Sequence, residues 1–388
     1  MKIVCVAGAR PNFMKIAPLM RVFNERAEFE PILVHTGQHY DEKMSGLFFR
    51  ELEIPLPDVN LGVGGGSHAV STAETMKAFE QVCLDKKPDA VLVVGDVNGT
   101  LACALVAVKL GIPTIHVEAG LRSGDRTMPE EINRIVVDSI SDVLFCTEKS
   151  GVKHLAEEGV ASERVFFVGN VMIDSLLRNK AKADALPTLE TLGLEPKKYA
   201  TLTLHRPRLV DDPKALVDVL GALEEIADDM PIVFPIHPRT RNRLSEFGLD
   251  RRVEKIANLR LVEPLGYLEF LKLNANAFVV LTDSGGLQEE TTALRVPCLT
   301  LRENTERPIT CEIGTNRLVG LDPNAILTAY RELKQGTVRV GKIPKFWDGR
   351  AAERIADVLA VIFDEATGIT NGFHEYKPFR RNLMKVVA

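Results

Sequence analysis

The segment AVLVVGDVNGTLACALVAVKLG, residues 90–111, decides the fold class of this chain. It opens with a short apolar run rich in valine, which ends at Gly95 and Asp96. A longer, helix-like apolar run follows and ends at Gly111. A strand without a polar face, followed directly by a helix, is typical of a parallel sheet that helices cover on both faces.

The same alternation of short apolar runs and helical patterns extends outward from this segment. The first series has further runs at residues 2–8, 30–37, 114–120, 143–148 and 164–170. After a polar connection, a second series has runs at residues 199–206, 232–238, 259–264, 277–286, 297–303 and 316–320. The sequence therefore predicts an α/β fold with two doubly wound, Rossmann-like domains.

The two series also indicate where the domains begin and end. A core rarely grows beyond about 250–300 residues, so a chain of 388 residues is expected to divide. We expect domains at residues 1–170 and 171–365, followed by a tail at residues 366–388. Two such domains imply a cleft between them, and ligands bind these sheets beyond the carboxyl ends of the strands. The residues directly after each strand are therefore the candidates for a site.

Composition and charge restrict the kind of partner. The net charge of −5 gives no reason to expect a nucleic acid or an anionic membrane surface. No stretch approaches the roughly 18 apolar residues of a membrane span, and the first apolar run is too short for a secretory signal. The six cysteines show no Cys-x-x-Cys spacing and lie mostly in apolar runs, which favours buried free thiols in a reducing compartment. We therefore expect a cytoplasmic protein.

Acidic residues follow two of the predicted strands. Asp96 ends the run that begins at Ala90, and Glu118 lies in the stretch HVEAGLRSGDRTMPEEINR, residues 116–134, which also contains Glu130. A lone acid at a strand end is usually a helix cap or a loop anchor, and the whole stretch could be a solvated loop. Carboxylates grouped in a water-poor cleft repel one another, so at least one pKa should rise, as an acid–base catalyst near neutral pH requires.

Other strand ends carry residues that suit a phosphate group. Ser284, Gly285 and Gly286 stand between a predicted strand and a helical pattern that contains Glu290. Glycines allow close approach of a ligand, and a helix N-terminus offers free N–H groups and a positive dipole end. Glu290 could accept hydrogen bonds from ribose hydroxyl groups. A plain glycine-cushioned turn explains this stretch equally well.

Basic residues and a histidine extend this interpretation. Arg10 and Lys15 follow the first apolar run, where basic side chains oppose the helix dipole, and this conflict favours phosphate binding over a solvated first turn. His205 and Arg206 follow the run that begins at residue 199, and His205 could contact phosphates or a carboxylate.

The sequence contains no pattern for a metal or a common nucleotide cofactor. The histidines and cysteines show no metal-ligand spacing, and neither Gly-x-Gly-x-x-Gly after the first strand nor a Walker motif is present. We therefore expect no metal and no cofactor, which disfavours nicotinamide-dependent enzymes and P-loop proteins. A diphosphate cradle with a cluster of acids suits a nucleotide-sugar enzyme and leaves the reaction open.

A set of motifs in one order narrows the choice. They are GARPNFMKIAPL, TGQHYDEKM, GDVN, HVEAGLRSGDRTMPEEINR, TLHRP, DSGGLQEE and RENTERP. Together they resemble the non-hydrolysing UDP-N-acetylglucosamine 2-epimerases from residue 1 to about residue 365. The resemblance implies a GT-B-like fold, a C-terminal helix that crosses back to the first domain, a tail that packs on that domain, and a homodimer.

The resemblance also implies a reaction. The family interconverts UDP-N-acetylglucosamine and UDP-N-acetylmannosamine and so supplies ManNAc for bacterial surface polysaccharides. Its route eliminates UDP across carbons 1 and 2, which leaves 2-acetamidoglucal, and then adds UDP back with a proton delivered to the opposite face of carbon 2. This route needs acid–base groups on both faces of carbon 2 and a cationic cradle for the diphosphate.

The matching motifs imply roles for individual residues. Those that resemble catalytic residues are Asp96, Glu118, Glu130 and His205. Those that resemble substrate contacts are Arg10 and Lys15 at the diphosphate, Ser284, Gly285, Gly286 and Glu290 at the phosphate and ribose, Phe270 at the uracil, and Arg206 and Arg307.

Two departures from the family pattern concern further positions. Leu209 stands where the family usually has an asparagine. A regulatory site near TGQH in many bacterial members is matched at Gln38 and His39 but not at Asp41.

Three alternatives remain open. The chain could be the hydrolysing relative, which releases ManNAc and UDP, or an epimerase for a modified UDP-sugar such as a diacetamido uronic acid. It could also be a UDP-sugar binding protein without catalytic activity, against which the set of acidic residues argues.

Overall fold

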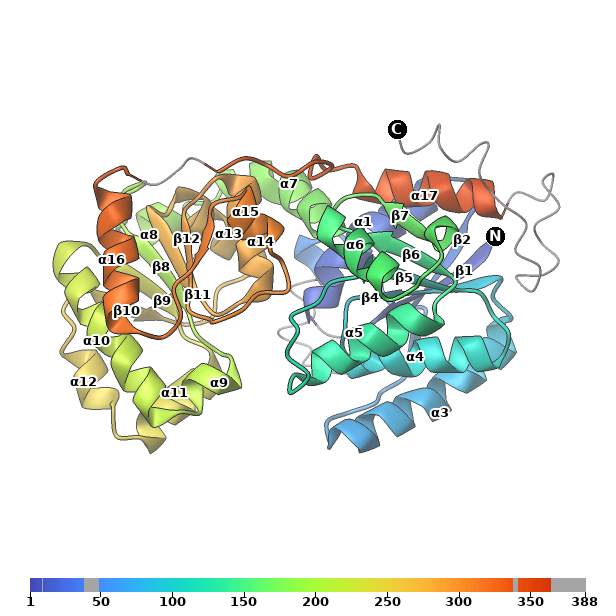
Figure 1. Ribbon diagram of the computed structural model, residues 1–388, viewed down its shortest axis with the longest axis horizontal. Helices are drawn as coiled ribbons and strands as arrows, with labels where there is room; N and C mark the ends of the chain where they lie inside the picture. Colours follow the sequence, from blue (N-terminus) through green and yellow to red (C-terminus); the bar gives the residue numbers. More distant parts are fainter. Residues whose placement is uncertain (9, 38–48, 338–340, 364–388) are drawn as a thin grey trace. The chain divides into compact units, whose positions relative to one another are not determined.

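The computed structural model describes residues 1–8, 10–37, 49–337 and 341–363, and it consists of two compact units (Figure 1). Unit 1 comprises the described residues of 1–178 and 345–363, and unit 2 those of 179–344. The tail predicted at residues 366–388 and the motif residues Gln38, His39 and Asp41 lie outside the described residues.

Unit 1 contains a seven-stranded parallel sheet in the order β3-β2-β1-β4-β5-β6-β7. Its strands are β1 (Lys2–Ala7), β2 (Glu30–His35), β3 (Val59–Asn60), β4 (Ala90–Val94), β5 (Thr114–Ala119), β6 (Val143–Cys146) and β7 (Val165–Phe167). Its helices are α1 (Arg10–Glu25), α3 (His68–Lys86), α4 (Asn98–Lys109), α5 (Pro129–Ile140), α6 (Lys149–Glu157), α17 (Ala351–Ile362) and the first part of α7 (Val171–Asp184). Helices α3, α4 and α5 cover one face of the sheet, and α1 and α17 lie together on the other (Figure 1).

Unit 2 contains a six-stranded parallel sheet in the order β10-β9-β8-β11-β12-β13. Its strands are β8 (Ala200–Thr203), β9 (Ile232–Pro235), β10 (Leu259–Val262), β11 (Val279–Thr282), β12 (Cys298–Thr300) and β13 (Asn316–Leu318). Its helices are α8 (Thr188–Thr191), α9 (Pro207–Val210), α10 (Pro213–Asp229), α11 (Pro238–Glu246), α12 (Asp250–Glu254), α13 (Tyr267–Asn276), α14 (Gly285–Leu294), α15 (Ile309–Glu312) and α16 (Pro323–Lys334). Both sheets confirm the predicted α/β class with two doubly wound halves.

The division of the chain differs from the boundaries expected at residues 170 and 365, because α17 packs on unit 1. The backbone N–H groups of Ala351 and Ala352, which begin α17, donate to Asp174 on α7 at 3.1 and 2.8 Å. Arg26 at the end of α1 pairs with Asp357 on α17 at 2.6 Å. The helical pattern at residues 351–363 is thus the predicted helix that returns to the first domain, and it belongs to that domain.

Strand register brings the candidate site residues of each unit to one edge of its sheet. In unit 1, Val94 on β4 pairs with Val117 on β5, so Gly95 and Glu118 leave neighbouring strands at the same level. In unit 2, Thr282 on β11 pairs with Thr203 on β8, so the residues after both strands also share an edge.

Burial follows from the cover of helices on both faces. Every residue of β4 and β5 is buried. All six cysteines are free thiols, and all of them except Cys311 are buried.

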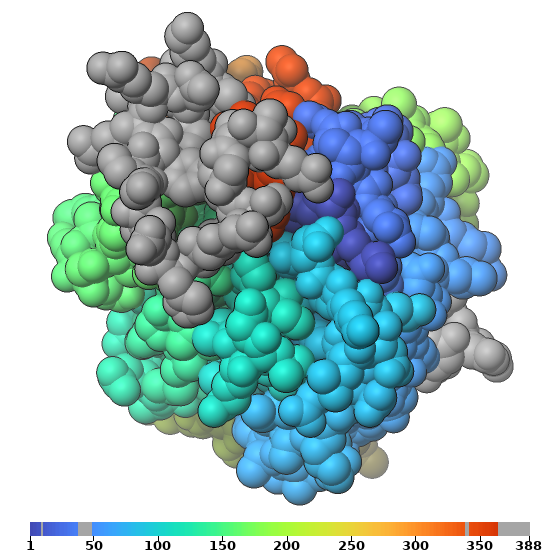
Figure 2. Space-filling model, turned by 90° about the vertical axis from the view of Figure 1, so that its right-hand side faces the viewer, coloured from blue at the N-terminus to red at the C-terminus, as the bar shows by residue number. Residues whose placement is uncertain are grey.

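At the surface shown in Figure 2, unit 1 presents α3 and α4, and both helices leave apolar side chains exposed, among them Val70, Leu84 and Val108. Within the described ranges, no helix combines the length and the apolar character that crossing a membrane requires.

Candidate functional site

The ends of β4 and β5 have unusual backbone conformations. Gly95 has φ +67°, and Glu118 has φ +77°, which lies in the left-handed region that non-glycine residues rarely adopt. The pairing of β5 with β6 shifts register between Val117 and Ala119, so Glu118 lies in an irregularity of the strand. Such a conformation costs on the order of 1–3 kcal/mol and persists where the surroundings impose it, often at functional sites.

Lys15 forms a buried ion pair with Glu118. The Lys15 ammonium on α1 donates to Glu118 Oε2, and the two side chains are 7% and 5% exposed. A Cβ atom at Gly95 would lie 3.0 Å from Lys15 Nζ and 3.2 Å from Glu118 Oε2, so glycine gives the pair its space. Lys15 therefore contacts a carboxylate in this structure, which the expected role at a diphosphate did not include.

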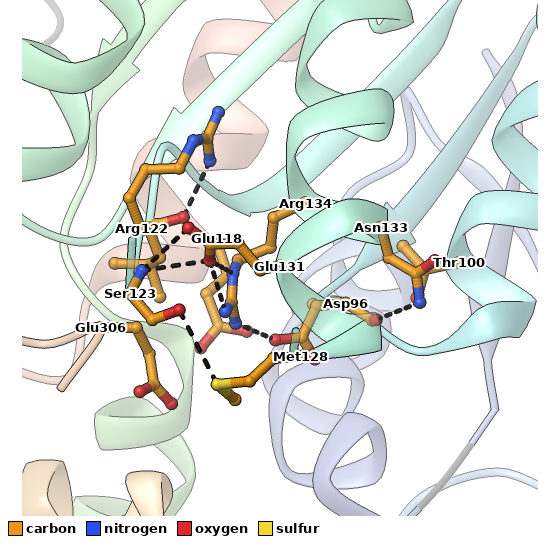
Figure 3. A network of polar contacts seen from close by, with 12 residues as sticks. Asp96, Thr100, Glu118, Arg122, Ser123, Met128, Glu131, Asn133, Arg134 and Glu306 are labelled. Atoms are coloured by element: carbon orange, nitrogen blue, oxygen red, sulfur yellow. Dashed lines mark hydrogen bonds and ion pairs between the residues drawn. The ribbon is translucent and has the colours of Figure 1, made fainter. Parts of the chain in front are cut away.

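A second cation lies against Asp96. Arg134 Nη1 on α5 donates to Asp96 Oδ2 at 2.5 Å, and Arg134 Nη2 donates to Glu131 Oε2 at 2.7 Å (Figure 3). Asn133 on the same helix donates to the Asp96 carbonyl oxygen at 2.8 Å. Helix α5 thus holds both the side chain and the backbone of Asp96.

Glu131 anchors this network, while the neighbouring Glu130 was the residue predicted from the sequence. Glu131 accepts hydrogen bonds from the backbone N–H groups of Ser123 and Gly124 and is 2% exposed. Burial alone would raise the pKa of Glu131, but these donors and Arg134 outweigh it and lower the pKa. Glu130 lies in the first turn of α5 and is partly exposed.

The two units differ in what surrounds their acidic residues. In unit 1, Glu118 and Asp96 each lie against a cation, Lys15 and Arg134, which stabilises the charged carboxylates. In unit 2, Asp283 directly follows β11 and is fully buried.

Asp283 holds the histidine that follows β8. Its Oδ2 accepts from the backbone N–H groups of His205 and Arg206, both at 2.7 Å, and its Oδ1 lies 2.8 Å from His205 Nδ1. Burial would raise the pKa of Asp283, but the His205 ring and the N–H donors outweigh it and lower the pKa. His205 remains 35% exposed at its side chain, so its ring is oriented by Asp283 and still accessible.

The turn before α14 has the features of an anion site. Ser284 is the N-cap residue, and α14 begins at the buried Gly285. A Cβ atom at Gly285 would lie 2.6 Å from Arg307 Nη1 and 2.7 Å from Glu306 Oε1, so a larger residue would require these side chains to shift. Gly286 follows in the first turn, where N–H groups lack helix partners.

Two acids of α14 have different surroundings. Glu289 pairs with Arg307 Nε at 2.8 Å, and Arg307 also pairs with Glu306 at 2.5 Å. Burial, together with the nearby charge of Glu289, raises the pKa of Glu290 to about 8. Arg307 therefore already faces two carboxylates, whereas Glu290 holds a proton at neutral pH.

The remaining predicted residues are placed as follows. Arg206 is the N-cap residue of α9, and Phe270 on α13 is partly buried against the apolar cluster beneath β11. Leu209, the departure from the family pattern, is 2% exposed in the core of unit 2, so this side chain serves packing. Arg10 begins α1, and its side chain lies outside what the structure describes.

Sequence reasoning missed several residues of these clusters. The sequence pattern assigns no role to Arg134, Glu131 and Asn133, which lie in the stretch at residues 116–134. It assigns none to Asp283 either, which begins the motif DSGGLQEE. A charged or amide residue within one helical turn of a candidate acid is the signal that could have found the first three. Among residues 1–363 as far as they are described, no group of three or more His, Cys, Asp or Glu side chains could hold a metal ion.

Several known proteins are similar to this chain over most of its length. The family model described as UDP-N-acetylglucosamine 2-epimerase matches residues 21–360. The chain is 43% identical over 364 residues to the UDP-N-acetylglucosamine 2-epimerase of Methanocaldococcus jannaschii, covering 92% of this chain and 99% of that protein. It is 40% identical to the UDP-2,3-diacetamido-2,3-dideoxy-D-glucuronate 2-epimerase of Pseudomonas aeruginosa, covering 93% of this chain and 99% of that protein.

A solved structure is similar over nearly the same length. It is the crystal structure of the Methanocaldococcus jannaschii UDP-GlcNAc 2-epimerase in complex with UDP-GlcNAc and UDP, with a TM-score of 0.86 and 42% identity. The match covers 93% of this chain and 99% of that one.

Proposed function

The chain belongs to the UDP-N-acetylglucosamine 2-epimerase family, and from this premise we propose that it interconverts UDP-N-acetylglucosamine and UDP-N-acetylmannosamine without net hydrolysis. The observation that supports this most is the pair of cation-bound carboxylates, Glu118 and Asp96, at the ends of neighbouring strands. Inversion at carbon 2 requires one group that removes a proton and another that returns it on the opposite face.

The carboxylates of unit 1 would perform the proton transfers. Glu118 and Asp96 lie beside the cations Lys15 and Arg134, and one of the two, in its ionised form, would accept the carbon 2 proton as a base. Elimination then breaks the bond between carbon 1 and the diphosphate oxygen and leaves 2-acetamidoglucal and UDP. In the return step the diphosphate oxygen adds to carbon 1, and a protonated carboxyl group delivers a proton to the other face of carbon 2. We assign Glu130 to this acid–base set as well.

Unit 2 would bind the nucleotide. The N–H groups of the Ser284, Gly285 and Gly286 turn suit the diphosphate, because an anion is stabilised at a helix N-terminus. His205, oriented by Asp283, can donate to the departing diphosphate. Glu290 carries a proton at neutral pH, so it can both donate to and accept from the ribose hydroxyl groups.

Four further residues complete the proposed substrate contacts. Phe270 would lie against the uracil, and Arg10 and Arg206 would add positive charge at the diphosphate. The charge of Arg307 is already neutralised by Glu289 and Glu306. Arg307 would therefore contribute chiefly by packing against Gly285 and fixing the turn that binds the diphosphate.

Incubation with UDP-N-acetylglucosamine in deuterated water, followed by proton NMR, tests this proposal. The expected result is loss of the carbon 2 proton signal together with the appearance of UDP-N-acetylmannosamine. Accumulation of free ManNAc and UDP would instead identify the hydrolysing reaction. Binding of the UDP-sugar without any deuterium at carbon 2 would identify a binding protein.

The similarity to the Pseudomonas aeruginosa protein supports a second candidate substrate. That protein is a 2-epimerase for a UDP-2,3-diacetamido uronic acid, and it is nearly as similar to this chain as the enzyme for UDP-N-acetylglucosamine. The same NMR experiment with both UDP-sugars in parallel separates the two, since the true substrate should exchange its carbon 2 proton at the higher kcat/KM.

We also propose that the protein acts as a homodimer in the cytoplasm and that its product supplies ManNAc for surface polysaccharide. Sedimentation of the purified chain tests the dimer. Disruption of the gene tests the role in polysaccharide synthesis, because the surface polysaccharide should then lack ManNAc.

A further inference from the structure

We propose that His116 and Asp138 form a positioning pair that fixes both turns bearing the acid–base carboxylates, with His116 in its doubly protonated, imidazolium form. The positioning role rests on the function proposed above, whereas the protonation state of His116 does not. Neither residue is proposed to touch the substrate.

The contacts of His116 link two strands and a helix. His116 lies on β5 and is completely buried. Its Nδ1 lies 2.6 Å from Asp138 Oδ1 on α5, and its Nε2 lies 2.8 Å from the carbonyl oxygen of Gly95, at the end of β4. Asp138 Oδ2 accepts from the backbone N–H of Gly120 at 3.0 Å and from Arg122 Nη1 at 2.7 Å.

These bonds are made by residues that lie next to Asp96 and on both sides of Glu118 in the sequence. Gly95 directly precedes Asp96, so the bond from His116 sets the turn from which Asp96 projects. His116 and Gly120 stand two residues before and two residues after Glu118, and Asp138 binds both of them. These bonds thus hold the backbone on both sides of Glu118, whose φ is positive, and one buried pair connects the backbone near Glu118 with that near Asp96.

Hydrogen-bond chemistry determines the protonation state of the ring. A carbonyl oxygen only accepts, so His116 Nε2 must carry a proton. A distance of 2.6 Å between Nδ1 and the Asp138 oxygen requires a second proton between them. Because two N–H donors, one of them a guanidinium, already stabilise negative charge on the other oxygen of Asp138, this second proton belongs to His116.

The groups around the pair are consistent with this charge. Arg122 is balanced by Glu158, which it meets through two bonds of 2.7 Å. Burial would raise the pKa of Asp138, but His116 and Arg122 outweigh it and lower the pKa. Burial raises the pKa of the Cys146 thiol on β6, and the charge of Asp138 raises it further, so this neighbour stays neutral. Two positive and two negative groups thus form one neutral chain, which runs from the buried His116 and Asp138 to the exposed Glu158.

Nitrogen-15 NMR of the histidine rings of the full chain tests the protonation state. We expect both His116 nitrogens to show the signature of a protonated imidazolium ring at neutral pH, because both ring nitrogens face acceptors. A neutral tautomer at neutral pH would overturn the assignment. This measurement requires no activity, so it decides the protonation state even where the wild-type chain fails to epimerise either UDP-sugar.

Kinetics of His116→Gln and Asp138→Asn test the positioning role. A glutamine amide carries both of its N–H donors on one nitrogen, so it cannot replace two ring nitrogens that face separate acceptors. The resulting displacement of Asp96 or Glu118 should lower kcat about 10²-fold while KM and UDP affinity stay at the wild-type level. Phe79→Leu is the control, because it loosens the core of unit 1 without removing any of these hydrogen bonds. The positioning role would be overturned if either variant kept the wild-type kcat. It would also be overturned if Phe79→Leu lost as much kcat at the same free energy of unfolding.

Discussion

Replacement of Lys15 by methionine tests the buried ion pair on which the proposed chemistry depends. Both Lys15 and Glu118 are nearly inaccessible, at 7% and 5% exposure. Methionine keeps the length of the lysine stem and removes its charge, so Glu118 is left buried without this counter-ion. Loss of one partner of a buried pair costs about 3–5 kcal/mol. Two unit charges 4 Å apart at an effective dielectric constant of about 20 give a similar value of about 4 kcal/mol.

The single tryptophan of the chain gives a specific readout for unit 1. Trp347 is 2% exposed, and its Nε1 donates to the carbonyl oxygen of Thr147 at 3.1 Å, within the same unit. Urea unfolding followed by Trp347 fluorescence should therefore show the free energy of unfolding of unit 1 falling by about 3–5 kcal/mol at neutral pH. The deficit should shrink at acidic pH, since protonation of Glu118 removes the uncompensated charge.

A double variant completes the test. Lys15→Met combined with Glu118→Gln leaves no charge in the site and should be more stable than Lys15→Met alone. A loss below about 1 kcal/mol, the value typical of exposed pairs, would refute the buried-pair reasoning. A double variant no more stable than the single one would refute it as well, because the penalty would then not come from the charge of Glu118.

Three other variants test separate parts of the proposal. Asp96→Asn should lower kcat by about 10²–10⁴-fold, because an amide cannot accept or donate the carbon 2 proton. Steady-state kinetics measures this loss, and calorimetry should show unchanged affinity for UDP. Gly285→Ala places a methyl group 2.6 Å from Arg307 Nη1 and should weaken UDP binding measured by calorimetry; unchanged affinity would remove this turn from the nucleotide site. The pKa of Glu290 is raised to about 8, so its stabilising contribution is present below its ordinary value near 4.5 and is lost as pH rises through 8. Glu290→Gln should therefore make unit 2 more stable than wild type above pH 8, by roughly 1.4 kcal/mol for each unit of pKa shift. Hydrogen exchange of the backbone amides of unit 2 measures this gain, and its absence would contradict the raised pKa of Glu290.

The fold was largely predictable because its determinants are local. Apolar strands such as residues 90–94 have no polar face, and this pattern alone indicates a parallel sheet under two layers of helices. The place of α17 was not predictable from its own residues, since its partner Asp174 lies 177 positions earlier in the chain. Amphipathic periodicity shows that a helix has an apolar face, but not which domain that face covers.

The candidate site was predictable in its acids and less so in their partners. Asp96 and Glu118 could be found because both end buried strands. Glu130 and Glu131 are neighbours in the same first helical turn, and only the fold reveals that Glu131 is the one that meets Arg134. The expected repulsion among carboxylates in unit 1 took no account of Lys15 and Arg134, because pairing across such distances in the chain leaves no trace in a single sequence.

The return of α17 to unit 1 has a consequence for synthesis on the ribosome. Residues 179–344 form a continuous unit that can complete its core as soon as it has been translated. Unit 1 is interrupted, and the surface that receives Ile355, Val358 and Leu359 stays uncovered until α17 has emerged. Unit 1 is therefore begun first in translation and completed last in folding. A nascent chain that stalls after residue 344 and before α17 has emerged would expose this apolar surface to chaperones.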